Sequence, residues 1–219
     1  MPLTPADLVA MVAEALSLPM TTVKNYDRKL MEAGLRTKKG HGRGSALMGP
    51  KDAAVLLAAI ASCDEIARAS ECVRTLYDMP YTPPPDESQY GLIRVPDLPG
   101  GGVRTKLSFL SELTGVDQKA ISTFGGALVA LMEHLVSSPD RKYSVTFEVL
   151  IGHGLLPYAA GLIIYEPRKP ANHIHFFREF GPFRKTILAQ LLITRAITGV
   201  NEIADALASR MNGKSGEPV

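Results

Sequence analysis

Three groups of residues in this sequence have types and spacing that suit chemistry or ligand recognition. The stretch RTKKGHGRGSALMGP (residues 36–50) has a glycine at every second position from Gly40 to Gly44, among basic residues. Residues 20–33 carry polar and basic side chains at helical spacing. The segment HIHFFRE (173–179) brings two imidazoles and a carboxylate together. What each group can do depends on the element that positions it.

The glycines of the first group suggest a loop that binds nucleotide phosphates. A Walker loop needs a lysine directly after its last glycine, but Ser45 follows Gly44. A dinucleotide-binding loop needs Gly-x-Gly-x-x-Gly between a strand and a helix, and here Ser45 takes the place of the third glycine. Both loops therefore fail, and we expect a protein that is not an enzyme, with no catalytic residues.

A basic hairpin is a better interpretation of the same stretch, although a flexible linker can have a similar composition. Leu35 on one side and residues 46–48 on the other are short apolar runs that can pair as two strands. The glycines would then form the tight tip, where positive φ angles are needed. Lys38, Lys39 and Arg43 would hold the tip on a phosphate backbone.

Two helices are predicted before this hairpin. Thr4 and Pro5 begin the first, over residues 4–16, and Pro19 breaks it. The second covers residues 20–33 and ends at Gly34, which readily takes the left-handed cap conformation. Its buried stripe includes Val23, and its other faces stay polar.

This order of helix, turn, helix and basic hairpin over residues 8–47 resembles the winged helix-turn-helix domains of bacterial and phage DNA-binding regulators. The resemblance covers the first quarter of the chain and rests on a pattern, not on an invariant signature. It implies that the second helix enters the major groove of double-stranded DNA while the wing contacts phosphates. The residues expected to contact DNA are Thr21, Thr22, Lys24, Asn25, Arg28, Lys29, Arg36, Lys38, Lys39 and Arg43.

The expected roles follow from side-chain chemistry. Thr21, Asn25 and Arg28 fall on one helical face. Asn can make two hydrogen bonds to adenine, and Arg can make two to guanine. The charge distribution agrees, because residues 1–51 hold eight Lys and Arg against four Asp and Glu, whereas the whole chain has a net charge of only +2. The alternative is that these side chains form ordinary solvated helix faces.

The third group looks like the first metal motif of cupins, in which two histidines and a carboxylate hold a divalent ion. The glycines that flank that motif are missing around His173 and Glu179, and three predicted strands cannot form an eight-stranded jelly roll. We therefore favour a half-exposed strand with His173 and His175 on its solvated face, and we expect no metal and no cofactor. A metal-dependent enzyme stays the alternative from another class.

The expected fold is α+β and mostly helical, with a small antiparallel sheet and helices in the C-terminal domain. Six of the 24 residues from 79 to 102 are proline and four are glycine, which indicates a linker. The expected parts are the winged domain (1–50), a long connecting or dimerisation helix (51–78), the linker (79–102), the α+β domain (103–211) and a disordered tail (212–219). Within the α+β domain we expect helices over residues 104–113 and 117–136, strands over 143–150, 162–165 and 173–177, a helix over 183–197, and a short helix capped by Asn201.

Compartment and partners complete the expectations. Cys63 and Cys72 show neither zinc spacing nor a disulfide framework, which indicates reduced thiols. No stretch is apolar enough for a membrane span, so we expect a cytoplasmic protein. The expected partners are double-stranded DNA, a second copy of the chain, and a small effector or protein at the C-terminal domain. A transcriptional regulator is the expected role, with a DNA-packaging or replication-recognition subunit as the alternative.

Overall fold

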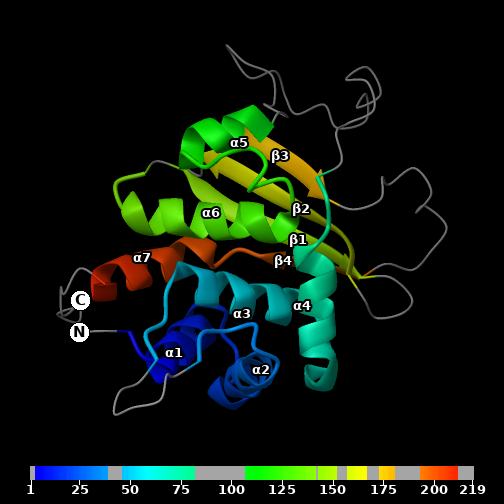
Figure 1. Ribbon diagram of the computed structural model, residues 1–219. Coiled ribbons are helices and arrows are strands. Elements are labelled where there is room, and N and C mark those ends of the chain that lie inside the picture. The colour runs from blue at the N-terminus through cyan, green and yellow to red at the C-terminus, as the bar shows by residue number, and fades with distance from the viewer. Residues whose placement is uncertain are drawn as a thin grey trace.

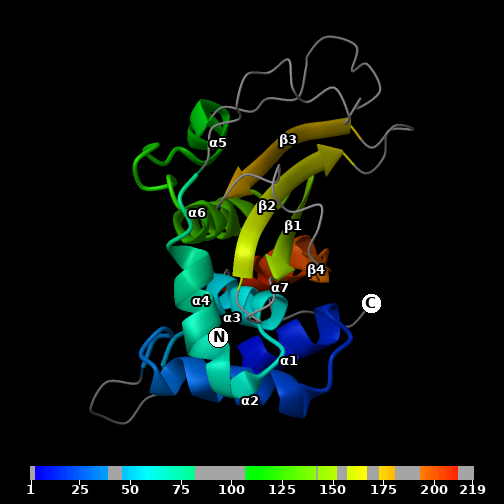
Figure 2. The same ribbon diagram turned by 90° about the vertical axis from the view of Figure 1, so that its right-hand side faces the viewer.

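The computed structural model describes residues 3–38, 46–81, 107–141, 143–151, 157–166, 173–180 and 193–211. Within them the protein is a mixed α+β structure, mostly helical, with one antiparallel sheet (Figures 1 and 2). The elements are α1 (Pro5–Ala15), α2 (Met20–Glu32), α3 (Pro50–Ser62), the 3-10 turn η1 (Ile66–Arg68), α4 (Ala69–Tyr77), α5 (Leu107–Thr114), α6 (Phe124–Ser137), β1 (Ser144–Ile151), β2 (Pro157–Glu166), β3 (His173–Phe180), β4 (Ile193–Ile197) and α7 (Val200–Met211).

The first helix begins as its sequence predicts. The Thr4 hydroxyl accepts a hydrogen bond of 3.3 Å from the Asp7 N–H, and the Asp7 carboxylate accepts one of 2.9 Å from the Thr4 N–H. This capping box satisfies N–H groups that have no partner inside the helix. After α1, Ser17 takes a φ of 52°, which turns the chain toward α2.

Helix α2 also matches its prediction. Val23, Tyr26 and Leu30 are buried along one side of it. At its end Gly34 has a φ of 73°, and the Leu35 N–H donates to the Leu30 carbonyl over 3.0 Å. The left-handed glycine lets the chain reverse while the last carbonyls of the helix keep a partner.

The long helix predicted over residues 51–78 is wrong, because the chain leaves the helical conformation after Ser62. Cys63 has extended backbone (φ −136°, ψ 132°), and a 3-10 turn leads into α4. The Cys63 carbonyl, which would continue the helix ladder, instead accepts a hydrogen bond of 2.6 Å from the Tyr26 hydroxyl of α2. Leu56 and Val73, on the apolar side of this predicted helix, are buried in the core of the chain.

The sheet has the strand order β3-β2-β1-β4, with antiparallel neighbours. Alternate residues of β1, among them Val145, Phe147 and Val149, are buried. The Phe147 ring meets Phe124 of α6 edge-on, with ring centroids 5.8 Å apart. Figures 1 and 2 show α6 against one face of the sheet, with α3 between α6 and the pair α1 and α2.

The helix predicted over residues 183–197 is wrong over its last five residues. Ile193–Ile197 is strand β4, which pairs with residues 147–151 of β1, and residues 181–192 lie outside the described part. Ile193 and Ile197 are β-branched and fit a pleated surface. Their distant partner strand decides the conformation, and local periodicity cannot reveal it.

The helix predicted to start at residue 117 begins later, at Phe124. The Thr123 hydroxyl caps it by accepting from the Gly126 N–H over 3.2 Å. Ile121 and Leu128 are fully buried, so the apolar side of this region packs in the core.

Asn201 does not cap the last helix, contrary to the prediction. It lies inside α7, and its side chain accepts from the Val145 N–H over 2.8 Å and donates to the Tyr143 carbonyl over 3.1 Å. The amide thereby pairs with β1 just before β4 begins to pair with it. This contact joins α7 to the sheet.

The described residues on both sides of the predicted linker share one hydrophobic core. The Tyr81 N–H donates to the Ser122 carbonyl over 2.7 Å, and the Phe124 N–H donates to the Met79 carbonyl over 2.9 Å. The two halves of the chain are therefore packed together. Residues 82–106 and the predicted tail (212–219) lie outside the described part.

Candidate nucleic-acid interface

The outward face of α2 carries four of the residues predicted to contact DNA. Thr21, Lys24, Asn25 and Arg28 are all exposed, whereas Val23 on the opposite side is fully buried. In Figures 1 and 2, α2 lies at the end of the molecule opposite the sheet. The helix thus presents a continuous polar face to solvent. Thr22 and Lys29 lie at the margins of this face and are half-buried.

The exposed charge on α2 is positive. This helix carries three cations outside its buried side, Lys24, Arg28 and Lys29, and one exposed carboxylate, Glu32. Glu32 lies 3.8 Å from the Arg28 Nε and 3.1 Å from the Lys29 Nζ. Exposed pairs of this kind contribute little stability, so both cations can exchange Glu32 for another anion at small cost.

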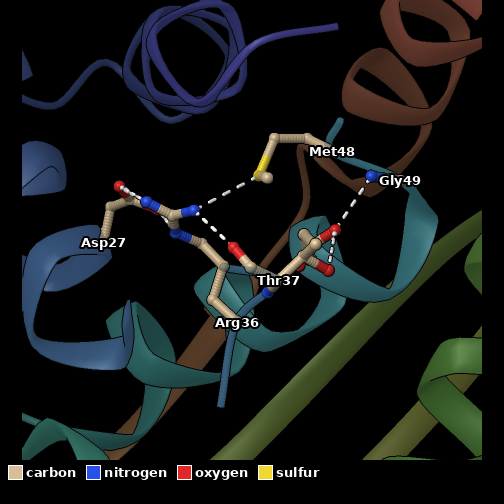
Figure 3. Close-up of polar contacts among 6 residues, drawn as sticks. Asp27, Arg36, Thr37, Met48 and Gly49 are labelled. Carbon is tan, nitrogen blue, oxygen red and sulfur yellow. Dashed lines mark hydrogen bonds and ion pairs between the residues drawn. The ribbon is translucent and has the colours of Figure 1, made fainter. Parts of the chain in front are cut away.

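The sequence predicted that Arg36 contacts DNA, but the structure corrects this prediction. Arg36 is buried and is not part of this exposed surface. Its side chain is only 4% exposed and forms an ion pair with Asp27 of α2, with a hydrogen bond of 2.8 Å from Nη2 to the carboxylate (Figure 3). Nη1 also donates to the Thr37 carbonyl over 2.9 Å and contacts the Met48 sulfur at 3.6 Å. A guanidinium held by these groups cannot reach a phosphate.

The same ion pair keeps the negative charge of Asp27 away from the exposed surface of α2. Burial raises the pKa of Asp27, while the adjacent Arg36 guanidinium acts in the opposite direction. Because Arg36 neutralises the ionised carboxylate internally, Asp27 does not offset the exposed cations. Sequence reasoning missed this pairing because nothing local distinguishes Arg36 from its basic neighbours.

Asp52 was not predicted as part of the site, yet it holds both ends of the segment 37–49. Its Oδ2 accepts from the Gly49 N–H over 3.0 Å, and its Oδ1 accepts from the Thr37 N–H over 2.8 Å. The Thr37 hydroxyl adds a contact of 3.2 Å to Oδ2. Pro50 followed by Asp52 at the third helical position is a capping pattern that could have indicated the Gly49 contact. The contact with Thr37 depends on tertiary structure.

The predicted pairing of the hairpin arms is wrong for the described residues. Residues 35–38 and 46–48 form no strand, and the Met48 N–H donates instead to the Leu3 carbonyl over 3.0 Å. The hydrogen bonds from Thr37 and Gly49 to Asp52, instead of pairing between two strands, hold the ends of segment 37–49 together. Lys38 is exposed next to it, whereas Lys39 and Arg43 lie outside the described residues, as do the glycines of the predicted tip.

Arg74 of α4 is an exposed cation that the sequence did not assign to this region. Its Nη2 donates to the Ala33 carbonyl at the end of α2 over 3.4 Å. A cation at this position suits the negative end of the helix dipole. Because α4 reaches α2 only through tertiary packing, no sequence spacing could have indicated the contact.

The predicted histidine group lies on β3, an edge strand of the sheet. The pairing of β3 with β2 is irregular here: Ile174 pairs with Tyr165 and Phe176 pairs with Ile164, which leaves His175 without a cross-strand partner in the register. The alternation that would place His173, His175 and Glu179 on one face is thus interrupted. Their side chains lie outside the described part, and the described residues contain no group of three potential metal ligands.

Comparisons of this chain with protein-family models, curated proteins and solved structures found no match. None of the described helices has both the length and the apolar character that crossing a bilayer requires. The geometry of α2 and its neighbours is therefore the basis for a functional proposal.

Proposed function

We propose that this protein binds double-stranded DNA through the outward face of α2, as a sequence-specific regulator of transcription. The observation that carries the proposal is the division of α2 into a buried apolar side and an exposed polar side with excess positive charge. A helix that is anchored along one side and bears Asn, Arg and Lys along the other is suited to the major groove.

The exposed side chains divide into two roles. Asn25 and Arg28 can each make paired hydrogen bonds to a base edge, to adenine and guanine respectively. Lys24 and Lys29 would contact phosphates, which adds affinity but little sequence information. Lys38, with Lys39 and Arg43 beyond it in the sequence, would extend the phosphate contacts.

The N-terminal end of α2 also supports a position of this helix against DNA. Pro19 supplies no capping side chain, and no acidic residue occupies the first turn. Met20 is 57% exposed, so the positive end of the helix dipole opens to solvent. A DNA phosphate at this end would be favourably placed.

A genomic fragment library bound at two salt concentrations tests the proposal. We expect the full-length protein to retain a reproducible subset of fragments, and to retain it less well as salt increases. The assay requires no assumption about the oligomeric state of the protein. Retention that is neither selective nor salt-dependent would contradict the proposal.

A further inference from the structure

Cys63 and Cys72, the two cysteines of the chain, form a buried pair at the junction of α3 and α4. Their Sγ atoms are 2.9 Å apart, with the Cys72 thiol donating toward Cys63. Cys63 directly follows α3, and Cys72 lies within α4, so the pair connects two helices across the break at residues 63–65. Both residues are reduced thiols in this structure.

We propose that Cys63 and Cys72 form a redox site, which a peroxide converts into an intramolecular disulfide. A disulfide bond holds its sulfur atoms about 2.05 Å apart, so the pair needs to close by less than about 1 Å. The thiols are already positioned by packed helices. This inference does not depend on DNA binding.

The position of the two residues decides the order of reaction. Cys63 has extended backbone at the end of α3, next to the exposed residues Asp64 and Glu65. Cys72 is fully buried in α4, where burial and the adjacent Cys63 raise the pKa of its thiol to about 12. Cys63 is itself 2% exposed but borders these exposed residues, whereas Cys72 is 0% exposed. We therefore expect a small oxidant that enters the fold to react with Cys63 first and Cys72 to complete the bond.

The reaction balances with hydrogen peroxide as the oxidant. The Cys63 sulfur attacks one peroxide oxygen and the O–O bond breaks, which forms a sulfenic acid; the displaced hydroxide takes up the proton that the Cys63 thiol loses and leaves as water. The Cys72 sulfur then attacks the Cys63 sulfur, the S–O bond breaks, and a second water leaves with the Cys72 proton. Two electrons pass from the sulfur atoms to the peroxide.

The disulfide would tie α3 to α4 next to the contact between α3 and α2. The Cys63 carbonyl accepts the 2.6 Å hydrogen bond from Tyr26, so the cysteine pair lies next to the buried side of α2. Closing a loop between two already packed helices restricts the unfolded chain more than the folded one. We expect the oxidised protein to unfold about 5 °C higher than the reduced protein.

Intact-mass spectrometry of the full-length protein tests the proposal. The folded protein is treated with dilute hydrogen peroxide, denatured and alkylated with N-ethylmaleimide. We expect a monomer lighter by two hydrogen atoms that takes up no N-ethylmaleimide, and recovery of both reactive thiols after dithiothreitol. Cys63→Ala and Cys72→Ala are the controls, and each should give a sulfur-oxygen product or a single alkylated thiol.

Three results would overturn the proposal, and all can be read from the wild-type protein. Both thiols could remain alkylatable after the treatment. Each cysteine could instead gain oxygen independently, as it would if the two sulfur atoms did not react with each other. Disulfides could also form only between separate chains at micromolar protein concentration. A failure of the variants to fold would leave the wild-type measurement unaffected.

Discussion

The guanidinium of Arg36 lies against the carboxylate of Asp27 inside the protein, with 4% and 9% of the two side chains exposed. This ion pair joins the chain that follows α2 to the buried side of α2. It also determines which charges remain outside, because it withdraws one residue of each sign from the surface. The stability of this part of the protein should depend on both members.

Replacing one member of the pair should be costly. We expect Arg36→Ala to lower the free energy of unfolding by about 3–5 kcal/mol, because it leaves the Asp27 carboxylate buried without its partner. Urea unfolding followed by circular dichroism measures this loss. Lys38→Ala is the matched control, since Lys38 is an exposed cation two positions away and should change stability little. An Arg36→Ala protein of unchanged stability would contradict the internal role.

On the outward face of α2, affinity and sequence preference should separate. We expect Lys24→Ala to weaken binding to all retained fragments and to reduce the slope of log K against log salt by about 1. Asn25→Ala should instead cost about 1–3 kcal/mol at one base pair and relax the preference there. Fluorescence anisotropy with matched duplexes measures both. Lys119→Ala, which removes an exposed lysine outside α2, is the control. A loss of DNA affinity in this variant equal to that of Lys24→Ala would contradict a specific role for α2.

Gly125 lies where α6 meets α4 and leaves no room for a side chain. A Cβ atom added there would lie 2.2 Å from Cδ1 of the Tyr77 ring. We expect Gly125→Ala to destabilise the protein by about 1–3 kcal/mol through overpacking. Thermal denaturation measures the effect, and the same change in a Tyr77→Ala background should cost much less. Gly49→Ala is a suitable control, since an added Cβ meets nothing within 4 Å there, and equal losses at both glycines would argue against the clash.

His134 should make stability depend on pH. Burial lowers the pKa of His134 below its ordinary value of 6.5, and the Arg141 charge lowers it further. Its ring stacks on Tyr143, with centroids 6.2 Å apart. Because the folded pKa is lowered, the contribution of the neutral ring is fully present above pH 6.5 and is lost as the pH falls through the folded pKa.

Urea unfolding at several pH values between 7.5 and 5 checks this expectation, with wild-type and His134→Gln proteins compared at each pH. The wild type should lose more stability on acidification than the variant, because only the wild type has this imidazole to protonate on unfolding. Parallel curves for the two proteins would show that other groups cause the pH dependence.

The sequence by itself determined the elements whose signals are local. Thr4, Pro5 and Asp7 specify the start of α1, and Gly34 specifies the end of α2, because capping hydrogen bonds join residues only a few positions apart. The buried and exposed sides of α2 also followed from periodicity, since successive turns of a helix bring every third or fourth residue to the same side. The mixed class with a small antiparallel sheet was predicted on the same basis.

Tertiary structure decided the features whose partners are far apart in the chain. Strand β4 forms because it pairs with β1. The break at Cys63 includes a hydrogen bond from the Tyr26 hydroxyl. Arg36 is buried because it binds the Asp27 carboxylate on the inner side of α2. Each outcome is set by a hydrogen bond or ion pair formed across the packed core, and the preferences of neighbouring residues are too weak to determine it. For the same reason, the sequence could list the cations near α2, but only the fold could separate those that face solvent from the one that holds the interior together.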